Sequence, residues 1–277
     1  MNHKHLIQTF LSLACCTAVA IALRTSFIPS ASAAATPPAQ TAGAEGAIPA
    51  AEQTLAALQS SRPSSIVADV SRETGAYTFV RSEGADVLAA DNPLASPEDR
   101  ARVFLAAHGA LVGMNDGERA AVADASRAAG LSMPGSALEV SRTFTDDIGA
   151  THVKFNQTYR GLKVFGAQLI VHMNGRGITA VNGNFIPDIA VDPNPTISEA
   201  AAAENALESV AKAKSVAPAN LIVGQTELAV FRTGLLEGYQ GSNVLAYGVK
   251  IADAGGPLEQ VWVSAATGAE LIRIPLK

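Results

Sequence analysis

Residues 151–185 constrain the fold of this chain more than any other segment does. Apolar and polar side chains alternate along the start of the segment, which is typical of a β-strand with one buried face. That face carries Val153, Phe155, Gln157 and Tyr159. Two turn signals, Arg160-Gly161 and Asn174-Gly175, separate this stretch from two further stretches with the same period. The segment therefore predicts an antiparallel β-meander.

The chain before the meander carries helix signals. Ser96 is a candidate N-cap, Pro97 suits the first helical position, and apolar residues follow at helical spacing up to Leu111. A second, alanine-rich helix is expected over residues 117–129. The meander is therefore expected to have flanking helices.

The proline-interrupted residues 188–195 divide the meander from a second pattern. Thr196 and Glu199 have the spacing of a capping box, which predicts a helix over residues 200–214. Strand-like segments follow at residues 226–231, 243–252, 258–263 and 271–274. The predicted fold class is α+β: an antiparallel β-meander with flanking helices, followed by a small domain in which one helix packs on an antiparallel sheet. The predicted domains span residues 61–190 and 196–275.

The N-terminus has the features of a secretory signal peptide over residues 1–33. Lys4 gives a basic start, an apolar run of 13 residues follows, and small residues at 31–33 offer a cleavage site. The run is shorter than the ~20 residues that span a bilayer, so no permanent membrane anchor is expected. We therefore expect a secreted or periplasmic protein. Residues 34–60 are rich in Ala, Pro and Gly and predict a disordered leader.

Charge and residue usage exclude several functions. The net charge of −5 and the absence of a Lys/Arg cluster argue against nucleic-acid binding. Both cysteines lie inside the predicted signal peptide, so a cysteine nucleophile or a cysteine-based zinc site is not expected. The chain has no G-x-S-x-G elbow. Residues 175–180 match the sequence pattern of a dinucleotide-binding motif, but the residues that follow predict a strand where that motif requires a helix.

Three histidines remain outside the predicted signal peptide: His108, His152 and His172. His152 and His172 fall on predicted strands and could be neighbours across the sheet, which leaves a two-histidine metal site as one interpretation. The other interpretation, two residues on the polar face of the sheet, is preferred because no third ligand is evident. We therefore expect no catalytic residue, no metal site and no cofactor.

The centre of the meander resembles the propeptide of thermolysin- and fungalysin-type zinc metalloproteases. The family pattern is carried by Gln157, Tyr159, Gly161, Val164, Phe165 and Gly166. The downstream half, including residues 245–249 and 261–271, resembles the small PepSY domain that follows in these proproteins. Ser264 departs from the Asp that usually stands at the matching position.

The resemblance implies a prosegment that acts as an intramolecular-type chaperone and inhibitor of a thermolysin-like metalloprotease. No HExxH zinc-ligand helix occurs before Lys277, so the chain is not expected to be an enzyme. It is either the N-terminal part of a truncated metallopeptidase precursor or a free-standing prosegment. The alternative is an extracellular binding module that is independent of any protease.

The C-terminal residues are the candidate contact with the protease cleft. The resemblance places the end of a prosegment nearest the enzyme, and the apolar side chains there are Leu271, Ile272, Ile274 and Leu276. An extended strand could add main-chain hydrogen bonds along a cleft edge. The competing interpretation is that residues 271–274 complete the sheet of the second domain.

Overall fold

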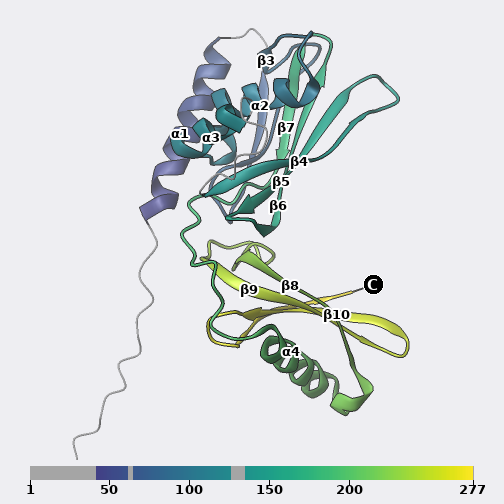
Figure 1. The fold of residues 1–277 in the computed structure, drawn as a ribbon. Helices are drawn as coiled ribbons and strands as arrows, with labels where there is room; N and C mark the ends of the chain where they lie inside the picture. Colours follow the sequence, from purple (N-terminus) through teal and green to yellow (C-terminus); the bar gives the residue numbers. More distant parts are fainter. Residues whose placement is uncertain (1–41, 62–64, 126–134, 277) are drawn as a thin grey trace, which may run out of the picture. The chain divides into compact units, whose positions relative to one another are not determined.

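The computed structural model describes residues 42–61, 65–125 and 135–276 (Figure 1). The chain divides into two compact units, Met1–Pro38 and Ala39–Lys277. The first unit contains the predicted signal peptide and lies outside the described residues. The helices of the second unit are α1 (Ala42–Ser60), α2 (Pro97–His108), η1 (Gly109–Val112), α3 (Asp116–Ala125), α4 (Glu199–Lys214) and η2 (Pro218–Asn220).

Within the described residues, the strands form a mixed, mostly antiparallel sheet of 11 strands, in the order β1-β2-β7-β6-β8-β9-β10-β11, with β3 on β7 and β4 on β5. Together with the helices, this confirms a mixed α+β fold. The strands are β1 (Ile66–Val70), β2 (Tyr77–Ser82), β3 (Ala89–Ala90), β4 (Ser136–Thr145), β5 (Thr151–Tyr159), β6 (Leu162–Asn174), β7 (Gly177–Gly183), β8 (Ile222–Arg232), β9 (Asn243–Asp253), β10 (Gly256–Ser264) and β11 (Glu270–Pro275).

Helix α1 differs from the expectation of a disordered leader over residues 34–60. Residues 34–41 lie outside the described part of the chain, but Ala42–Ser60 is helical. Ala51 is only 1% exposed, and Leu58 belongs to the main hydrophobic core, with Leu55 packed against it. Burial of these few side chains supports a helix whose composition alone is too poor in bulky residues to predict it.

Helix α2 begins as predicted. The Ser96 side chain accepts a hydrogen bond from the Asp99 backbone N–H, Pro97 occupies the first turn, and Glu98 and Asp99 lie where the helix dipole favours acids. Gly109 caps its C-terminus, and the chain continues as η1 up to Gly113, whose φ is +92°.

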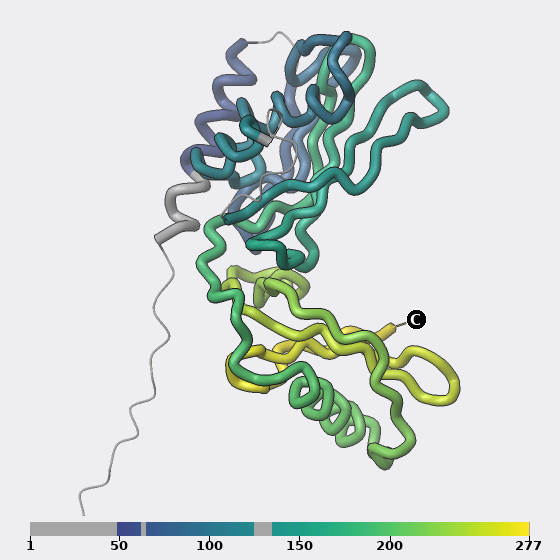
Figure 2. The backbone as a smooth tube through the Cα atoms, in the orientation of Figure 1, coloured from purple at the N-terminus to yellow at the C-terminus, as the bar shows by residue number. Residues whose placement is uncertain are grey.

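The meander is confirmed. Strands β5, β6 and β7 are antiparallel neighbours, and the β6–β7 turn lies at Asn174–Gly177. Strand β4 adds to the outer edge of β5 and contacts α2 through the Thr143–Glu98 hydrogen bond, while the tip of the β4–β5 hairpin extends away from the helices in Figure 2. The predicted buried face of β5 is correct, because Val153, Phe155, Gln157 and Tyr159 are all buried.

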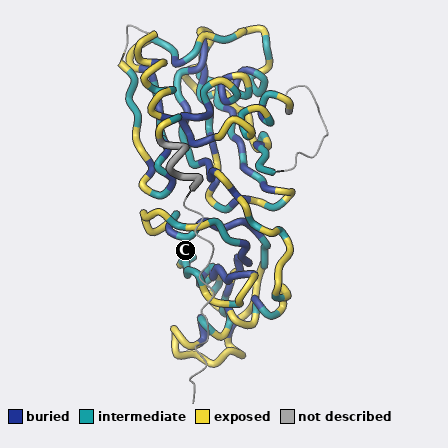
Figure 3. The backbone as a smooth tube through the Cα atoms, turned by 90° about the vertical axis from the view of Figure 1, so that its left-hand side faces the viewer, coloured by how far each residue is buried: buried dark blue, intermediate teal, exposed yellow. Residues whose placement is uncertain are grey.

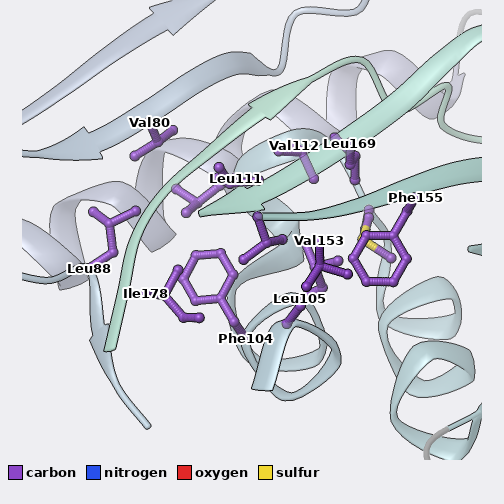
Figure 4. Close-up of a cluster of buried hydrophobic side chains, with 14 of the residues drawn as sticks. Val80, Leu88, Phe104, Leu105, Leu111, Val112, Val153, Phe155, Leu169 and Ile178 are labelled. Carbon is purple, nitrogen blue, oxygen red and sulfur yellow. The ribbon is translucent and has the colours of Figure 1, made fainter. Parts of the chain in front are cut away.

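Helices α2 and η1 cover this face of the meander. Figure 4 shows side chains from α2 and η1, including Phe104, Leu105 and Leu111, packed against Val153 and Phe155 of the sheet. Burial of each of these large side chains contributes roughly 1.5–3 kcal/mol relative to exposure. This is the main core of the meander half.

The downstream half is one helix on the antiparallel strands β8–β11. Apolar side chains of α4, including Ala206 and Val210, pack against Val249 and Val261 of the sheet. The helix is capped two residues after the predicted cap Thr196: the Ser198 side chain accepts a hydrogen bond from the Ala201 N–H. The Thr196 N–H instead donates to the Ala265 carbonyl, so the backbone at Thr196 belongs to the sheet connection.

The two halves share a short strand pairing. Lys163 and Val164 of β6 lie in parallel register with Ala229 and Val230 of β8. Both halves fall in the single compact unit Ala39–Lys277, although their largest hydrophobic clusters are separate. The domain limits at residues 61–190 and 196–275 stay a prediction.

Figure 3 shows that the buried positions follow the strands, while loops and turns are exposed. Among the described residues, no helix combines the length and the apolar character needed to cross a bilayer.

Candidate functional site

The six motif residues gather where β5 turns into β6. Gln157 and Tyr159 are on β5, Gly161 is in the turn, and Val164, Phe165 and Gly166 are on β6. The first part of β6 is also the part that pairs with β8. The motif therefore lies at the connection between the meander and the downstream strands.

The Gln157 side chain is the buried polar centre of this region. Its Nε2 donates to the Ile186 carbonyl at 2.8 Å, and its Oε1 accepts from the Ile186 N–H at 2.8 Å. Nε2 also lies 3.2 Å from the Ser136 hydroxyl. The side chain is 1% exposed, so its amide satisfies backbone groups of Ile186 that water does not reach.

Two motif glycines have positive φ angles. Gly161 (φ +80°) follows Arg160 (φ +48°), so both central residues of the two-residue turn adopt the left-handed conformation of a type I′ hairpin. Gly166 (φ +72°) lies between the residues of β6 that pair with β8 and those that pair with β7. A Cβ at Gly166 would lie 2.8 Å from Cδ2 of Leu235 in the β8–β9 loop, the end of a flexible side chain, so the positive φ favours glycine here more than this contact does.

The apolar motif residues reach opposite faces of the sheet. Tyr159 and Val164 join a small cluster with Ile186 and Val230. Phe165 lies on the other face, where its ring centroid is 5.6 Å from that of Phe231 and 4.5 Å from that of Trp262. Both contacts join β6 to the downstream half.

Leu271, Ile272 and Ile274 lie on β11, which pairs antiparallel with β10. All three are partly buried against the cluster around Trp262. Leu276 follows the strand, and its backbone N–H donates to the Leu258 carbonyl.

The β11 strand is held from the helix side as well. Arg273 lies 3.4 Å from a Glu259 carboxylate oxygen and 3.0 Å from Glu270, and it donates to the Ser209 hydroxyl of α4. Lys214, at the end of α4, also pairs with Glu259 at 2.8 Å. The strand is therefore fixed in place by groups on both faces, and it is the last strand in the sheet order.

A partly buried carboxylate, Glu118, has no counterpart in the sequence analysis. Glu118 and Asn115 form a reciprocal cap at the start of α3: Asn115 N–H donates to Glu118 Oε2, and Glu118 N–H donates to Asn115 Oδ1. The Asn115 amide also donates to Asp188. Burial and, to a smaller extent, the nearby Asp188 carboxylate together raise the pKa of Glu118 to about 7, against hydrogen bonds that lower it.

Arg232 is a second connecting residue that the sequence analysis missed. Its guanidinium is buried and donates to the Glu73 carbonyl at 2.9 and 3.2 Å, and to Asn243 Oδ1 at 3.2 Å. Burial lowers the pKa of Arg232, and the Asp188 carboxylate opposes that shift. A lone arginine gives no local signal of such burial, because its partners are far away in the sequence.

His152 and His172 are cross-strand neighbours, as the sequence suggested. Their Nδ1 atoms lie 2.6 Å apart, while His152 Nε2 is 2.9 Å from Asp146 Oδ2 and His172 Nε2 is 2.5 Å from Asn182 Oδ1. Burial lowers the pKa of His172, and the adjacent His152 adds to that effect. Within the described ranges, no group of three or more His, Cys, Asp and Glu side chains is placed to hold a metal ion.

The other sequence candidates are structural. Residues 175–180 enter strand β7 directly, so the dinucleotide fingerprint is not followed by a helix. His108 ends α2, and its ring packs against Phe104 at a centroid distance of 5.2 Å.

Comparison with known proteins finds a match for the meander. Residues 136–185 match the family model described as the Fungalysin/Thermolysin Propeptide Motif, and these residues cover β4 to β7. Over 68 residues the chain is 37% identical to thermolysins from Alicyclobacillus acidocaldarius subsp. acidocaldarius, Bacillus caldolyticus and Bacillus sp. (strain EA1). The matched segment is 24% of this chain and spans only 12% of the length of each thermolysin.

Proposed function

We propose that this chain is a secreted prosegment that acts as a folding chaperone and inhibitor of a thermolysin-like metalloprotease. The match of residues 136–185 to the propeptide motif carries this proposal. The identity of 37% to three thermolysins over 68 residues supports it. The chemistry required is surface complementarity, because a chaperone or inhibitor stabilises its partner through buried interface and not through an acid, base or metal of its own.

The proposal includes two domains, a propeptide-type domain at residues 61–190 and a PepSY-like domain at residues 196–275. Two observations support the division: each half has its own hydrophobic cluster, and α4 packs on the antiparallel strands β8–β11. The protease partner would supply the HExxH helix, either in the same polypeptide or as a separate chain.

The proposed contact with the protease cleft is the C-terminal stretch Leu271, Ile272, Ile274 and Leu276. Strand β11 stands last in the sheet order, so its outer edge is placed to add main-chain hydrogen bonds to an extended partner segment. Ile272 and Ile274 also pack beside Trp262, so replacing them would test the fold together with the contact. Leu276 lies beyond the strand and is the better probe.

Inhibition and refolding assays test the proposal. The chain without its predicted signal peptide is titrated against mature thermolysin from Bacillus caldolyticus with a peptide substrate, and is added to the same enzyme during refolding from denaturant. We expect inhibition that saturates near one equivalent and a higher yield of active enzyme. Neither effect, with this enzyme or with the two other matched thermolysins, would overturn the proposal and leave the protease-independent binding module.

A matched pair of variants locates the contact. Leu276→Asp places a charge at the proposed contact, whereas Leu94→Asp places the same charge on a side chain that is 94% exposed in the loop before α2. We expect at least tenfold weaker inhibition from Leu276→Asp and no change from Leu94→Asp, with both folds checked by circular dichroism. Equal inhibition by the two variants would place the contact elsewhere, with the β4–β7 meander as the next surface to test.

A further inference from the structure

The His152–His172 pair is the centre of a chain of hydrogen bonds that crosses three strands of the meander. The chain runs from Asp146 in the β4–β5 turn to His152 on β5, to His172 on β6 and to Asn182 on β7. The three contacts between consecutive side chains measure 2.9, 2.6 and 2.5 Å. Every ring nitrogen of the two histidines therefore has one polar partner.

The number of protons on the two rings is limited by this geometry. The Asp146 carboxylate only accepts, so His152 Nε2 carries a hydrogen, and the two Nδ1 atoms share one hydrogen between them. Rotation of the Asn182 amide presents either its oxygen or its NH₂ group to His172 Nε2. Two neutral rings satisfy all three contacts when Asn182 donates, and one protonated ring satisfies them when Asn182 accepts.

Two protonated rings do not fit the same arrangement. Both Nδ1 atoms would then carry a hydrogen, and the two N–H groups would point at each other across 2.6 Å. Burial lowers the pKa of His172, and the adjacent His152 lowers it further, while Asn182 and Asp146 oppose the shift. The pair therefore accepts one proton and resists the second.

Charged side chains around the pair also disfavour a second proton. Cross-strand register places Arg81 of β2, Lys154 of β5 and Arg142 of β4 on the same face of the sheet as the two histidines, and the Arg142 guanidinium lies over the Phe144 ring. The acids at this end of the sheet are Asp146 and the exposed Asp147 of the turn, and Glu98 of α2, which contacts Thr143.

His152 connects the outer end of the β4–β5 hairpin to the rest of the sheet. Asp146 shapes the turn, because its Oδ1 accepts from the N–H groups of Ile148 and Ala150 while its Oδ2 faces His152. Phe144 of β4 stacks on the His152 ring at a centroid distance of 4.8 Å. Residues 141–145 of β4 are exposed, and this end of the hairpin extends away from the helices in Figure 1.

We propose that the His152–His172 pair is an acid-sensitive latch that holds the outer end of the β4–β5 hairpin to the meander. A second proton forces one ring to turn toward water, and the contacts of His152 with Phe144 and Asp146 then lose their support. Because opening takes up a proton, the latch is closed near neutral pH and opens as pH falls below the ordinary histidine value of about 6.5. The sequence shows the two histidines but not the contacts that limit their protons.

Hydrogen exchange of the full chain between pH 7.5 and pH 5 tests the latch. After correction for the intrinsic exchange rate, the opening constant of residues 141–150 should rise about tenfold per pH unit below the second titration, as uptake of one proton requires. The β9–β10 hairpin, which contains no histidine, is the internal reference. His172→Gln should abolish the rise, because His152 can then be protonated without facing a second N–H group, whereas His108→Gln should retain it.

Ring-nitrogen NMR of the unchanged chain gives a second test that needs no variant. The two rings should titrate in two steps more than one pH unit apart, with the second step below 6.5. Titration of both rings together near 6.5 would overturn the proposal. A rise in the opening constant that is absent, or that is equal in His172→Gln, would overturn it as well. Both measurements use the chain without a protease, so their outcome is independent of the proposed function.

Discussion

Gln157 offers the most direct test of how the motif stabilises the fold. Replacing it with alanine removes the amide that pairs with both backbone groups of Ile186. The site is buried, so water cannot easily replace the lost partner. Each buried backbone group left without a partner costs roughly 1–3 kcal/mol, so the N–H and the carbonyl of Ile186 together cost roughly 2–6 kcal/mol.

A middle value of about 4 kcal/mol is a large part of the stability of a domain of this size. For a unit of this length, each kcal/mol lowers Tm by about 2–4 °C, so the expected drop for Gln157→Ala is roughly 8–16 °C. Urea unfolding and thermal unfolding followed by circular dichroism measure both quantities. Gln157→Glu should also destabilise at neutral pH, because a carboxylate cannot donate to the Ile186 carbonyl.

Gln168→Ala is the matched control. Gln168 is on the neighbouring strand β6 and is exposed, and its Nε2 bonds Asn156 Oδ1 at the surface. Surface changes of this kind stay within about 0.5 kcal/mol. If Gln157→Ala costs no more than Gln168→Ala, the buried amide pairing with Ile186 does not contribute as argued.

Three further predictions follow from buried groups. The pKa of Glu118 is raised to about 7 in the folded chain, so its contribution to the free energy of unfolding is present below pH 4.5 and is lost as pH rises through 7. Urea unfolding at pH 5 and pH 8 should therefore show a decrease in the free energy of unfolding of up to about 3 kcal/mol, which Glu118→Gln abolishes. An equal decrease in the variant would contradict this prediction. Gly248→Ala places a Cβ 2.9 Å from the buried ring of Trp262, the single tryptophan of the chain. It should lower the free energy of unfolding by about 1–3 kcal/mol and change the tryptophan fluorescence. Gly175→Ala is the control, because its Cβ would meet nothing within 4 Å, and it should change neither quantity. Arg232→Met leaves a carbonyl of the β1–β2 turn unpaired and should lower the free energy of unfolding by about 1–3 kcal/mol in urea, and an unchanged midpoint would refute the bond's contribution.

The meander could be predicted because its signals are local. The alternation of side chains sets which face of β5 is buried, and the turn residues at 160–161 and 174–175 set where the strands reverse. The start of α2 was predictable for the same reason, since Ser96 and Pro97 act on backbone groups within one turn.

Helix α1 could not be predicted from composition, because its stability comes from contacts distant in sequence. Leu55 and Leu58 pack on the core of the meander, and isolated helices gain little without such packing. The parallel pairing of β6 with β8 covers two residue pairs separated by more than 60 residues of chain, and no local pattern marks it. The raised pKa of Glu118 depends on burial and on the Asp188 carboxylate, and both arise from contacts made only in the folded chain.

The positions of the motif residues indicate that the motif holds the meander and the downstream strands together. Val164 and Phe165 are consecutive, yet Val164 packs on Val230 and Phe165 packs on Phe231. Side chains of β6 therefore contact side chains of β8 on both faces of the sheet. Gly166 then leaves room for Leu235 of the following loop. A partner bound at β11 would therefore act on strands that are already fixed to the meander, and it would not have to order them. Preordered contacts cost less conformational entropy on binding, which is what an inhibitor without catalytic groups needs for affinity.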